Sequence, residues 1–355
     1  MGEFSAVGAW PGVIAELIAG NELAPQVAAG ALERMLDGTA TDAQIAAFIV
    51  ALRIKGETVE EVTGLVGAML AVSSPLTLDD PEATVDIVGT GGSKALAGKA
   101  FNVSTMASLV AAAAGATVCK HGNRKASSTS GSTDLLEALG VAVELDGDGV
   151  LSCLRSAGVG FAFARVFHPS MRHVAPVRAQ LGVPTVFNIL GPLSHPGRVG
   201  RQVIGVSDPR LMQLVPQVLR RRGLTHAWVI HGEGGLDELT TTGSTQVTEL
   251  FEGELRSFVV EPEQVGLARV SLDEIRVGGP EENAIAARSI LDAERGPLRD
   301  MVVLNAAAGL LVGGCATNLA AGVELATAAI DDGRAAAVLG KLVAISQASA
   351  QAQSN

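Results

Sequence analysis

Apolar positions recur with helical spacing through residues 1–80. One run follows a Thr41-x-x-Gln44 capping box and stops at Gly56, and a second run follows Thr58-x-x-Glu61. An earlier helix is expected around residues 28–36. The pattern therefore predicts a small unit made only of helices. Two apolar faces fit either a core or a surface that pairs two subunits: Ile45, Phe48, Ile49 and Leu52, and Val62, Leu65, Val66 and Met69.

The periodicity changes after Pro81, where short apolar strands alternate with helical runs. Strands are expected at residues 84–88, 116–119 and 225–230, and helices at residues 101–114 and 133–139. Such alternation is typical of an α/β sheet with mostly parallel strands. The expected fold class is α/β, with a small all-helical domain and a larger α/β domain built on a central, mostly parallel sheet.

The domain boundaries follow from these patterns. Residues 1–80 form the expected helical domain, and a segment at about 170–198, in a stretch rich in Pro, Arg and His, is expected to return to it. Residues 81–169 and 199–345 form the expected α/β domain. Residues 346–355 are small and polar, which predicts a flexible, frayed tail.

Composition excludes some classes of partner. The 355 residues suit about two domains, and 48% hydrophobic content supplies a large core. The net charge of −11 argues against nucleic acid or an anionic membrane surface as a partner. An acidic protein that binds an acidic ligand needs a local basic pocket.

Location in the cell is predicted from three features. Residues 301–323 carry no charge and are long enough to span a membrane, but Asn305, Asn318 and several glycines favour a buried helix or a strand–helix pair. The N-terminus lacks the pattern of a secretory signal. Cys119, Cys153 and Cys315 are far apart without metal spacing, which suits reduced thiols in a cytoplasmic protein.

The densest chemistry begins at the glycine turn Gly89-Thr90-Gly91-Gly92, which follows the first expected strand. Backbone N–H groups in such a turn suit phosphate oxygens, although an ordinary strand-to-helix turn has the same sequence character. The run from Lys120 to Lys125 adds three fixed cations, and residues 127–133 are rich in hydroxyls. Together these segments predict a ligand with several phosphates. They contain no obvious nucleophile–base pair, so the leaving group is expected to drive the reaction.

Two further clusters have both functional and structural interpretations. Asp237-Glu238 follows a glycine-rich loop and suits Mg²⁺, which shares its coordination with phosphates and water, or an acidic turn that caps a helix. Within the stretch from His168 to Arg178, an arginine can clamp a carboxylate or form a salt bridge. His168 and His173 lack a third metal ligand nearby.

In combination, these motifs resemble the anthranilate phosphoribosyltransferase family from about Trp10 to Val343. The resemblance implies a fold like that of nucleoside phosphorylases and phosphoribosyltransferases, a homodimer formed through the helical domain, and two Mg²⁺ ions. It also implies transfer of the phosphoribosyl group of 5-phosphoribosyl 1-pyrophosphate (PRPP) to anthranilate, in tryptophan biosynthesis. The motifs that carry it are Gly89–Gly92, Asn102–Thr105, Lys120–Arg124 with Ser127 and Ser128, His168–Arg178, Asn188–Pro192 and Leu236–Thr240.

The resemblance also implies roles for individual residues. Matches to the PRPP contacts are Gly89, Thr90, Gly92, Ser93, Asn102, Val103, Ser104, Thr105, Lys120, Ser127, Ser128 and Ser132. Matches to the anthranilate contacts are Gly89, His121, Asn123, His168 and Arg178, and matches to the metal positions are Ser104, Asp237 and Glu238. No residue is expected to act as a covalent or acid–base catalyst, because positioning and electrostatics suffice.

The loop after the glycine turn departs from the family pattern. Ser93 stands where Asp is usual, Ala100 stands where Thr is usual, and the loop 93–100 looks about three residues longer and carries Lys94 and Lys99. Either the added cations replace part of the electrostatic role of a metal ion, or the loop is mobile and the enzyme slow.

Three rival functions remain open from sequence. A pyrimidine nucleoside phosphorylase resembles this fold and also reacts at ribose C1. A related phosphoribosyltransferase would use another aromatic acceptor. A non-catalytic homologue would bind nucleic acid, against which the net charge and the retained Asp237-Glu238 argue.

Overall fold

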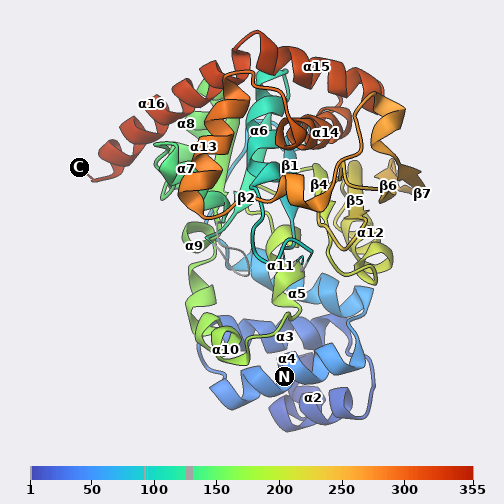
Figure 1. Cartoon of the computed structure of the whole chain (residues 1–355). Helices are drawn as coiled ribbons and strands as arrows, with labels where there is room; N and C mark the ends of the chain where they lie inside the picture. The colour runs from blue at the N-terminus through green and yellow to red at the C-terminus, as the bar shows by residue number, and fades with distance from the viewer. Residues whose placement is uncertain (1, 92, 94, 125–130, 355) are drawn as a thin grey trace.

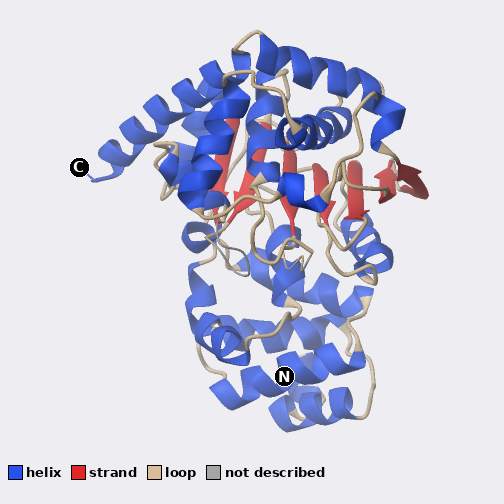
Figure 2. Ribbon diagram, viewed as in Figure 1, coloured by secondary structure: helices blue, strands red, loops and turns tan. Residues whose placement is uncertain are grey.

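The chain forms a bundle of helices joined to a seven-stranded sheet that is covered by further helices (Figure 1). The computed structural model describes residues 2–91, 93, 95–124 and 131–354. Figure 2 shows the strands within the upper part only, with the helical bundle below them. The expected α/β class, with a small helical part and a larger part containing a mostly parallel sheet, is confirmed.

The helical bundle begins where the hydrophobic pattern predicts it. Both expected capping boxes are present, with Thr41 accepting from the Gln44 amide and Thr58 from the Glu61 amide. Each box satisfies two N–H groups that a helix start otherwise leaves unpaired. The helices are α1 (Glu3–Ala6), α2 (Ala9–Ile18), α3 (Pro25–Leu36), α4 (Asp42–Lys55) and α5 (Val59–Ala71).

A later segment returns to this bundle. It consists of α9 (Ala164–Phe167), η1 (Pro169–His173), α10 (Ala175–Leu181) and α11 (Phe187–Leu193). Helix α10 contacts α4, α11 contacts α5, and η1 contacts α3. Residues far apart in the sequence therefore pack together in the bundle, and α11 and α5 lie on its side nearest the sheet (Figure 1).

The sheet has the strand order β3-β2-β1-β4-β5-β6-β7. Strands β1 to β5 pair in parallel, and β6 and β7 continue the sheet in antiparallel pairing. Parallel strands end at one edge of the sheet, where ligands of α/β proteins usually bind. The strands are β1 (Val85–Gly89), β2 (Val118–Gly122), β3 (Val159–Phe163), β4 (Arg201–Gly205), β5 (His226–Gly232), β6 (Thr245–Phe251) and β7 (Glu254–Val260).

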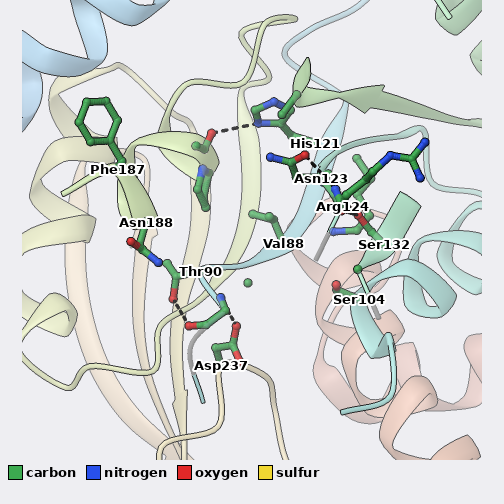
Figure 3. A pocket seen from close by; sticks show the side chains of 18 of the residues that line it. Val88, Thr90, Ser104, His121, Asn123, Arg124, Ser132, Phe187, Asn188 and Asp237 are labelled. Carbon is green, nitrogen blue, oxygen red and sulfur yellow. Dashed lines mark hydrogen bonds between the residues drawn. The ribbon is translucent and has the colours of Figure 1, made fainter. Parts of the chain in front are cut away.

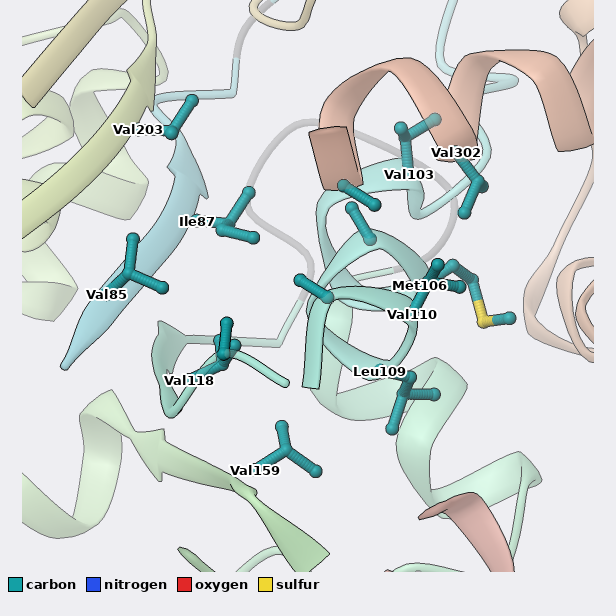
Figure 4. Close-up of a cluster of buried hydrophobic side chains, with 14 of the residues drawn as sticks. Val85, Ile87, Val103, Met106, Leu109, Val110, Val118, Val159, Val203 and Val302 are labelled. Atoms are coloured by element: carbon teal, nitrogen blue, oxygen red, sulfur yellow. The ribbon is translucent and has the colours of Figure 1, made fainter. Parts of the chain in front are cut away.

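One face of the sheet packs on α6 (Val103–Ala113) and α14 (Pro297–Val312). Figure 4 shows Val85 and Ile87 of β1 facing Met106 and Val110 of α6, and all four side chains are buried. Burial of one such side chain contributes about 1.5–3 kcal/mol relative to exposure. This packing fixes the start of α6 beside the end of β1.

The opposite face of the sheet shares its core with the helical bundle. Val88, Ile204 and Val229, from β1, β4 and β5, belong to one apolar cluster with residues of α2 to α5. Helix α12 (Leu211–Arg221) packs against both β5 and α5. The two parts of the molecule are therefore joined by continuous apolar packing.

The remaining elements cover the first face and its edges. They are α7 (Ser132–Ala138), α8 (Gly147–Ala157), η2 (Pro262–Val265), η3 (Leu272–Ile275), α13 (Pro280–Leu291), α15 (Leu319–Asp331) and α16 (Arg334–Ser354). Residues 301–323 lie in α14, α15 and the turn between them, so of the two expected alternatives the buried helix is the correct one, formed by α14. Among the described residues, no helix is both long enough and apolar enough to cross a membrane.

The expectation of a frayed tail from residue 346 is wrong up to Ser354. Helix α16 continues through this segment. Ser346 is fully buried, and its Oγ accepts the amide N–H of Ala142 at 3.0 Å. The hydrogen bond to Ala142, in a distant loop, requires a small polar side chain at this position. The small polar residues that suggested a disordered tail therefore include one that packs in the core.

Candidate active site

A pocket of about 770 Å³ lies between the carboxyl edge of the sheet and the helical bundle. One wall comes from the ends of β1 and β2 and the starts of α6 and α7, and the opposite wall from α5, η1, α10 and α11 (Figure 3). Most residues singled out from sequence line it: Gly89, Thr90, Ser93, Asn102, Ser104, Lys120, His121, Asn123, Ser132, His168, Arg178, Asp237 and Glu238.

Five expected residues are not placed there by the structure. Val103 and Thr105 are buried in the core beneath the pocket, because they occupy the inward face of the first turn of α6. Gly92, Ser127 and Ser128 lie outside the described residues.

The acidic turn Asp237-Glu238 sits directly on the ends of three strands. Glycines stand at those ends: Gly89 of β1, Gly205 of β4 and Gly232 of β5. A Cβ on Gly89 or Gly205 would overlap Asp237, and one on Gly232 would lie 2.7 Å from the Glu238 carbonyl oxygen. Absence of a side chain at these positions is what lets the turn reach the pocket.

Burial raises the pKa of both carboxyl groups of the acidic turn, and for Glu238 the neighbouring Asp237 raises it further. The Gly91 N–H donates to Asp237 Oδ2 at 2.6 Å and opposes the shift. The backbone of Ser104, at the start of α6, likewise opposes the shift of Glu238. Two crowded carboxylates that burial disfavours are a site that a cation would stabilise.

The two described cations of the Lys120–Lys125 run, Lys120 and Arg124, both line the pocket but have different partners. Lys120 is buried, and its Nζ donates to the Ile87 carbonyl at 2.6 Å. Arg124 turns to Glu137, with its two terminal nitrogens at 2.6 and 2.7 Å from the carboxylate oxygens. Lys125 lies outside the described residues. Lys120 therefore offers its charge from beneath the pocket, and Arg124 is already paired.

Burial lowers the pKa of Lys120, while the charges of Asp86, Glu238 and Asp237 oppose this shift. Asp86 itself is fully buried on β1 and accepts the amide of His121 at 3.1 Å and the side chain of Gln202 at 3.0 Å. Lys120 and the acidic turn thus belong to one buried electrostatic network.

Three histidine rings lie together: those of His121 and His168 line the pocket, and that of His195 is fully buried. The ring of His121 is 5.2 Å from that of His168 and 5.7 Å from that of His195, centroid to centroid. Burial lowers the pKa of His121 well below its usual value, that of His168 to about 4 and that of His195 to about 3. His121 Nδ1 lies 2.9 Å from the Gly191 carbonyl, to which the neutral ring donates. This wall is therefore uncharged at neutral pH.

Arg178 contributes a cation on the opposite wall. Its guanidinium lies 5.3 Å from the centre of the Phe187 ring, and burial lowers its pKa. Among the described residues, no carboxylate lies within ion-pair distance of it. A half-buried arginine of this kind suits a planar carboxylate, which its guanidinium fork can bind at two points.

Comparison with known proteins agrees with this geometry. The family model "Glycosyl transferase family, a/b domain" matches residues 81–336, and "Glycosyl transferase family, helical bundle domain" matches residues 11–73. The anthranilate phosphoribosyltransferase of Mesorhizobium japonicum is 48% identical over 94% of this chain and 97% of its own length. That of Chloroflexus aggregans is 48% identical over 95% of this chain and 98% of its own. The chain belongs to the anthranilate phosphoribosyltransferase family.

Solved structures of the family share the fold. The enzyme from Thermus thermophilus superposes with a TM-score of 0.88 at 42% identity, covering 94% of this chain and 99% of that one. The Saccharomyces cerevisiae enzyme in complex with PRPP and Mg superposes with a TM-score of 0.86 at 28% identity, covering 96% of this chain and 98% of that one. The same yeast enzyme has also been solved with 4-fluoroanthranilate.

The loop that departs from the family pattern lies at the mouth of the pocket. Ser93 and Ala100 line the pocket, and Lys99 is exposed. The Val277 amide holds the loop through the Lys99 carbonyl at 3.0 Å. Ser93 Oγ is buried without a hydrogen-bond partner among the described residues. Lys94 lies outside that part of the chain.

Several residues that shape the site were not expected from sequence. Met69 of α5 and Phe187 of α11 line the pocket, and Asn283 of α13 accepts the backbone and side-chain N–H groups of Asn102 at 2.9 and 3.0 Å. Asn305 of α14 holds the backbone of Leu239, next to the acidic turn. The one available signal was an asparagine within an uncharged apolar run, at residue 305.

Proposed function

We propose that the protein transfers the phosphoribosyl group of PRPP to anthranilate and releases pyrophosphate. The amine nitrogen forms a bond to ribose C1 as the bond from C1 to the pyrophosphate oxygen breaks, and that bonding pair leaves with pyrophosphate. The nitrogen then loses its proton. The observation that carries this proposal is one pocket with a partly buried carboxylate pair and a glycine turn on one wall, and on the other a half-buried arginine without a carboxylate partner among the described residues.

The donor would bind on the wall at the sheet edge. The N–H groups of Thr90 and Gly91 are already bonded, to Gly205 and Asp237, so the backbone contribution that suits phosphate oxygens would come from the N-terminus of α6. Ser104 and Ser132 add hydroxyls, and Lys120 adds positive charge from below. These groups would stabilise the charge that develops on the departing pyrophosphate.

The carboxylates of Asp237 and Glu238, with the Ser104 hydroxyl, fit a hard divalent cation. Both carboxylates line the pocket, and their pKa values are raised because burial leaves their negative charge poorly compensated. The described residues contain no cluster of three acidic, cysteine or histidine side chains that could hold a metal, so phosphate oxygens and water would complete the coordination. We propose two Mg²⁺ ions, which when bound would neutralise the charge of pyrophosphate.

Anthranilate would bind between the end of β2, which carries His121, and the wall that carries His168 and Arg178. Arg178 would take its carboxylate, and the neutral rings of His121 and His168 with the exposed amide of Asn123 would line the path of its amine. An aromatic amine is already a free base at neutral pH, so the site needs no strong general base. Orientation of the amine toward C1 is then the main contribution of this wall.

We also propose a homodimer formed through the helical domain. Ile18 at the end of α2 and Ile54 near the end of α4 are 74% and 81% exposed, on two helices that contact each other. Light scattering coupled to size exclusion tests this directly, because replacement of both by Asp should yield monomers if these side chains pair two subunits.

The function is tested by following the loss of anthranilate fluorescence with PRPP and Mg²⁺, omitting each component in turn. Loss of signal that requires all three components supports the proposal. If anthranilate is not consumed but calorimetry detects binding of PRPP, another aromatic acceptor becomes the better proposal. If PRPP does not bind either, the phosphoribosyl transfer itself is refuted, and phosphorolysis of thymidine or uridine is the next assay.

A further inference from the structure

The acidic turn has no helix or strand of its own to hold it. Between β5 and β6, Gly232 and Leu236 exchange two backbone hydrogen bonds before the turn, and the Thr240 amide bonds to Thr245 Oγ1 after it. Asp237 and Glu238 lie between these two anchor points. Besides the Gly91 N–H that holds the Asp237 side chain, their direction into the pocket depends on what fixes the residue that follows them, Leu239.

Both backbone polar groups of Leu239 are held by a single side chain. The Leu239 N–H donates to Asn305 Oδ1 at 3.0 Å, and Asn305 Nδ2 donates back to the Leu239 carbonyl at 2.8 Å. The second N–H of Nδ2 donates to the Met301 carbonyl within α14 at 2.9 Å. The amide of Asn305 is thus bonded through its oxygen and through both N–H groups, and it anchors the turn to a helix of the core.

Burial of the Asn305 amide would destabilise the protein unless its hydrogen bonds with Leu239 and Met301 compensate. It is 2% exposed in a helix whose other buried residues are nearly all apolar. A buried amide is tolerated only when it is hydrogen-bonded, and without it the N–H and C=O groups of Leu239 would be buried and unpaired. An apolar side chain at this position could not make these hydrogen bonds and so could not direct the turn.

We propose that Asn305 is a positioning residue that, by clamping Leu239, orients the carboxylates of Asp237 and Glu238 toward the donor end of the pocket. The proposal rests on the proposed function for the identity of the ligands there. It adds a residue that touches neither substrate and acts only through the backbone of the turn. Loss of the hydrogen bonds between Asn305 and Leu239 should therefore weaken binding of Mg²⁺ and of the pyrophosphate group and leave anthranilate binding unchanged.

The test compares Asn305→Leu, which is nearly isosteric, and Asn305→Ala, which leaves room for a water, with the unaltered protein. Leu310→Ala is the matched control, since Leu310 is a fully buried residue of the same helix and its side chain cannot hydrogen-bond to the turn. Amide hydrogen exchange of the segment 236–240 reports on the clamp without ligand. Calorimetry with inorganic pyrophosphate and Mg²⁺ reports on the donor end without turnover.

Both Asn305 variants should exchange the Leu239 amide faster, and should weaken Mg²⁺-dependent pyrophosphate binding by about 10-fold, the usual scale for a residue supporting a metal ligand. The KM for anthranilate should stay within about twofold. Leu310→Ala should lower the melting temperature and change neither exchange in the turn nor pyrophosphate binding.

Unchanged exchange and pyrophosphate binding in both Asn305 variants, or an equal rise in the anthranilate KM, would overturn the proposal. Should the unaltered protein fail to consume anthranilate, the proposed reaction is refuted. Exchange and pyrophosphate binding still decide the role of Asn305 in that case.

Discussion

The N–H of Gly91 donates a 2.6 Å hydrogen bond to Oδ2 of Asp237, across 146 positions of sequence. This bond joins the glycine turn after β1 to the acidic turn after β5 and makes them one wall of the pocket. The turn proposed to bind phosphate and the turn proposed to bind a cation are thereby placed side by side, as a metal pyrophosphate would require.

Loss of the Asp237 carboxylate should therefore weaken the binding of PRPP, the phosphoribosyl donor. In Asp237→Ala, we expect the KM for PRPP and the Mg²⁺ concentration for half-maximal rate to rise by at least about 10-fold, since a direct ligand should matter no less than its supporting residues. Initial rates at varied PRPP and Mg²⁺ measure both quantities, and the KM for anthranilate serves as the internal control. A similar rise in all three quantities would contradict the assignment of the two walls.

For a change at Arg178 we expect the opposite result, with an effect on anthranilate and little effect on PRPP. Removal of a charge-assisted hydrogen-bonding group costs about 1.5–3 kcal/mol, which corresponds to about 10- to 100-fold in affinity. Arg178→Ala should thus raise the KM for anthranilate by that factor and leave the KM for PRPP little changed. Arg172→Ala is the matched control, because Arg172 is an exposed arginine on the same wall of the pocket. Equal effects of both variants would argue that only the general positive field matters.

The local parts of this site and fold could be predicted from sequence. Capping boxes at Thr41 and Thr58, the strand before Gly89 and the helix after Asn102 depend on residues within a few positions of one another. The family motifs then brought Gly89 and Asp237 to one site, which their contact in the structure agrees with.

Long-range partners could not be predicted in this way. A lysine in a basic run is expected to reach a ligand, yet Lys120 donates to the carbonyl of Ile87 on the neighbouring strand. Arg124 similarly pairs with Glu137, one helix away. The roles of Asn283 and Asn305 depend on which backbone groups the fold leaves unpaired, and only the folded chain reveals that.

Stability should depend on pH through the buried histidines. The pKa of His195 falls to about 3 through burial, while the unfolded value is about 6.5. Because the unfolded chain binds this proton first as the pH falls, His195 makes the protein less stable as pH drops from about 6.5 toward 3, by about 1.4 kcal/mol per pH unit. The dependence is confined to that window.

His195→Gln should remove this contribution. Unfolding of the variant should take up about one proton fewer between about pH 6.5 and 4. Its free energy of unfolding should therefore fall less steeply with falling pH in this range than that of the unaltered protein. Denaturant unfolding at a series of pH values measures the slope. An unaltered slope would mean that His195 is already protonated in the folded protein. His173, whose side chain is only partly buried on η1, provides the control substitution.

A buried ion pair should stabilise the helical bundle. Lys55 Nζ lies 2.9 Å from Glu61 Oε2, and Glu61 Oε1 also accepts the amide of Leu23 at 2.9 Å. Removing one partner of a buried pair typically destabilises by about 3–5 kcal/mol, because the other charge stays buried and unpaired. Glu61→Ala should show this loss in denaturant unfolding. Arg269→Ala, which breaks an exposed pair, should change stability by no more than about 1 kcal/mol.

The glycine at the end of β4 tests how tightly the acidic turn is seated. A Cβ at Gly205 would overlap the backbone of Asp237, which cannot move away as a flexible side chain could. Gly205→Ala should therefore displace the turn and weaken PRPP and Mg²⁺ binding at least as strongly as Asp237→Ala. Gly67→Ala is the control, since nothing lies near its Cβ and alanine should stabilise helix α5 by up to about 1 kcal/mol. A fully active Gly205→Ala enzyme would show that the turn tolerates displacement and that its close seating on the strand ends is not what the reaction needs.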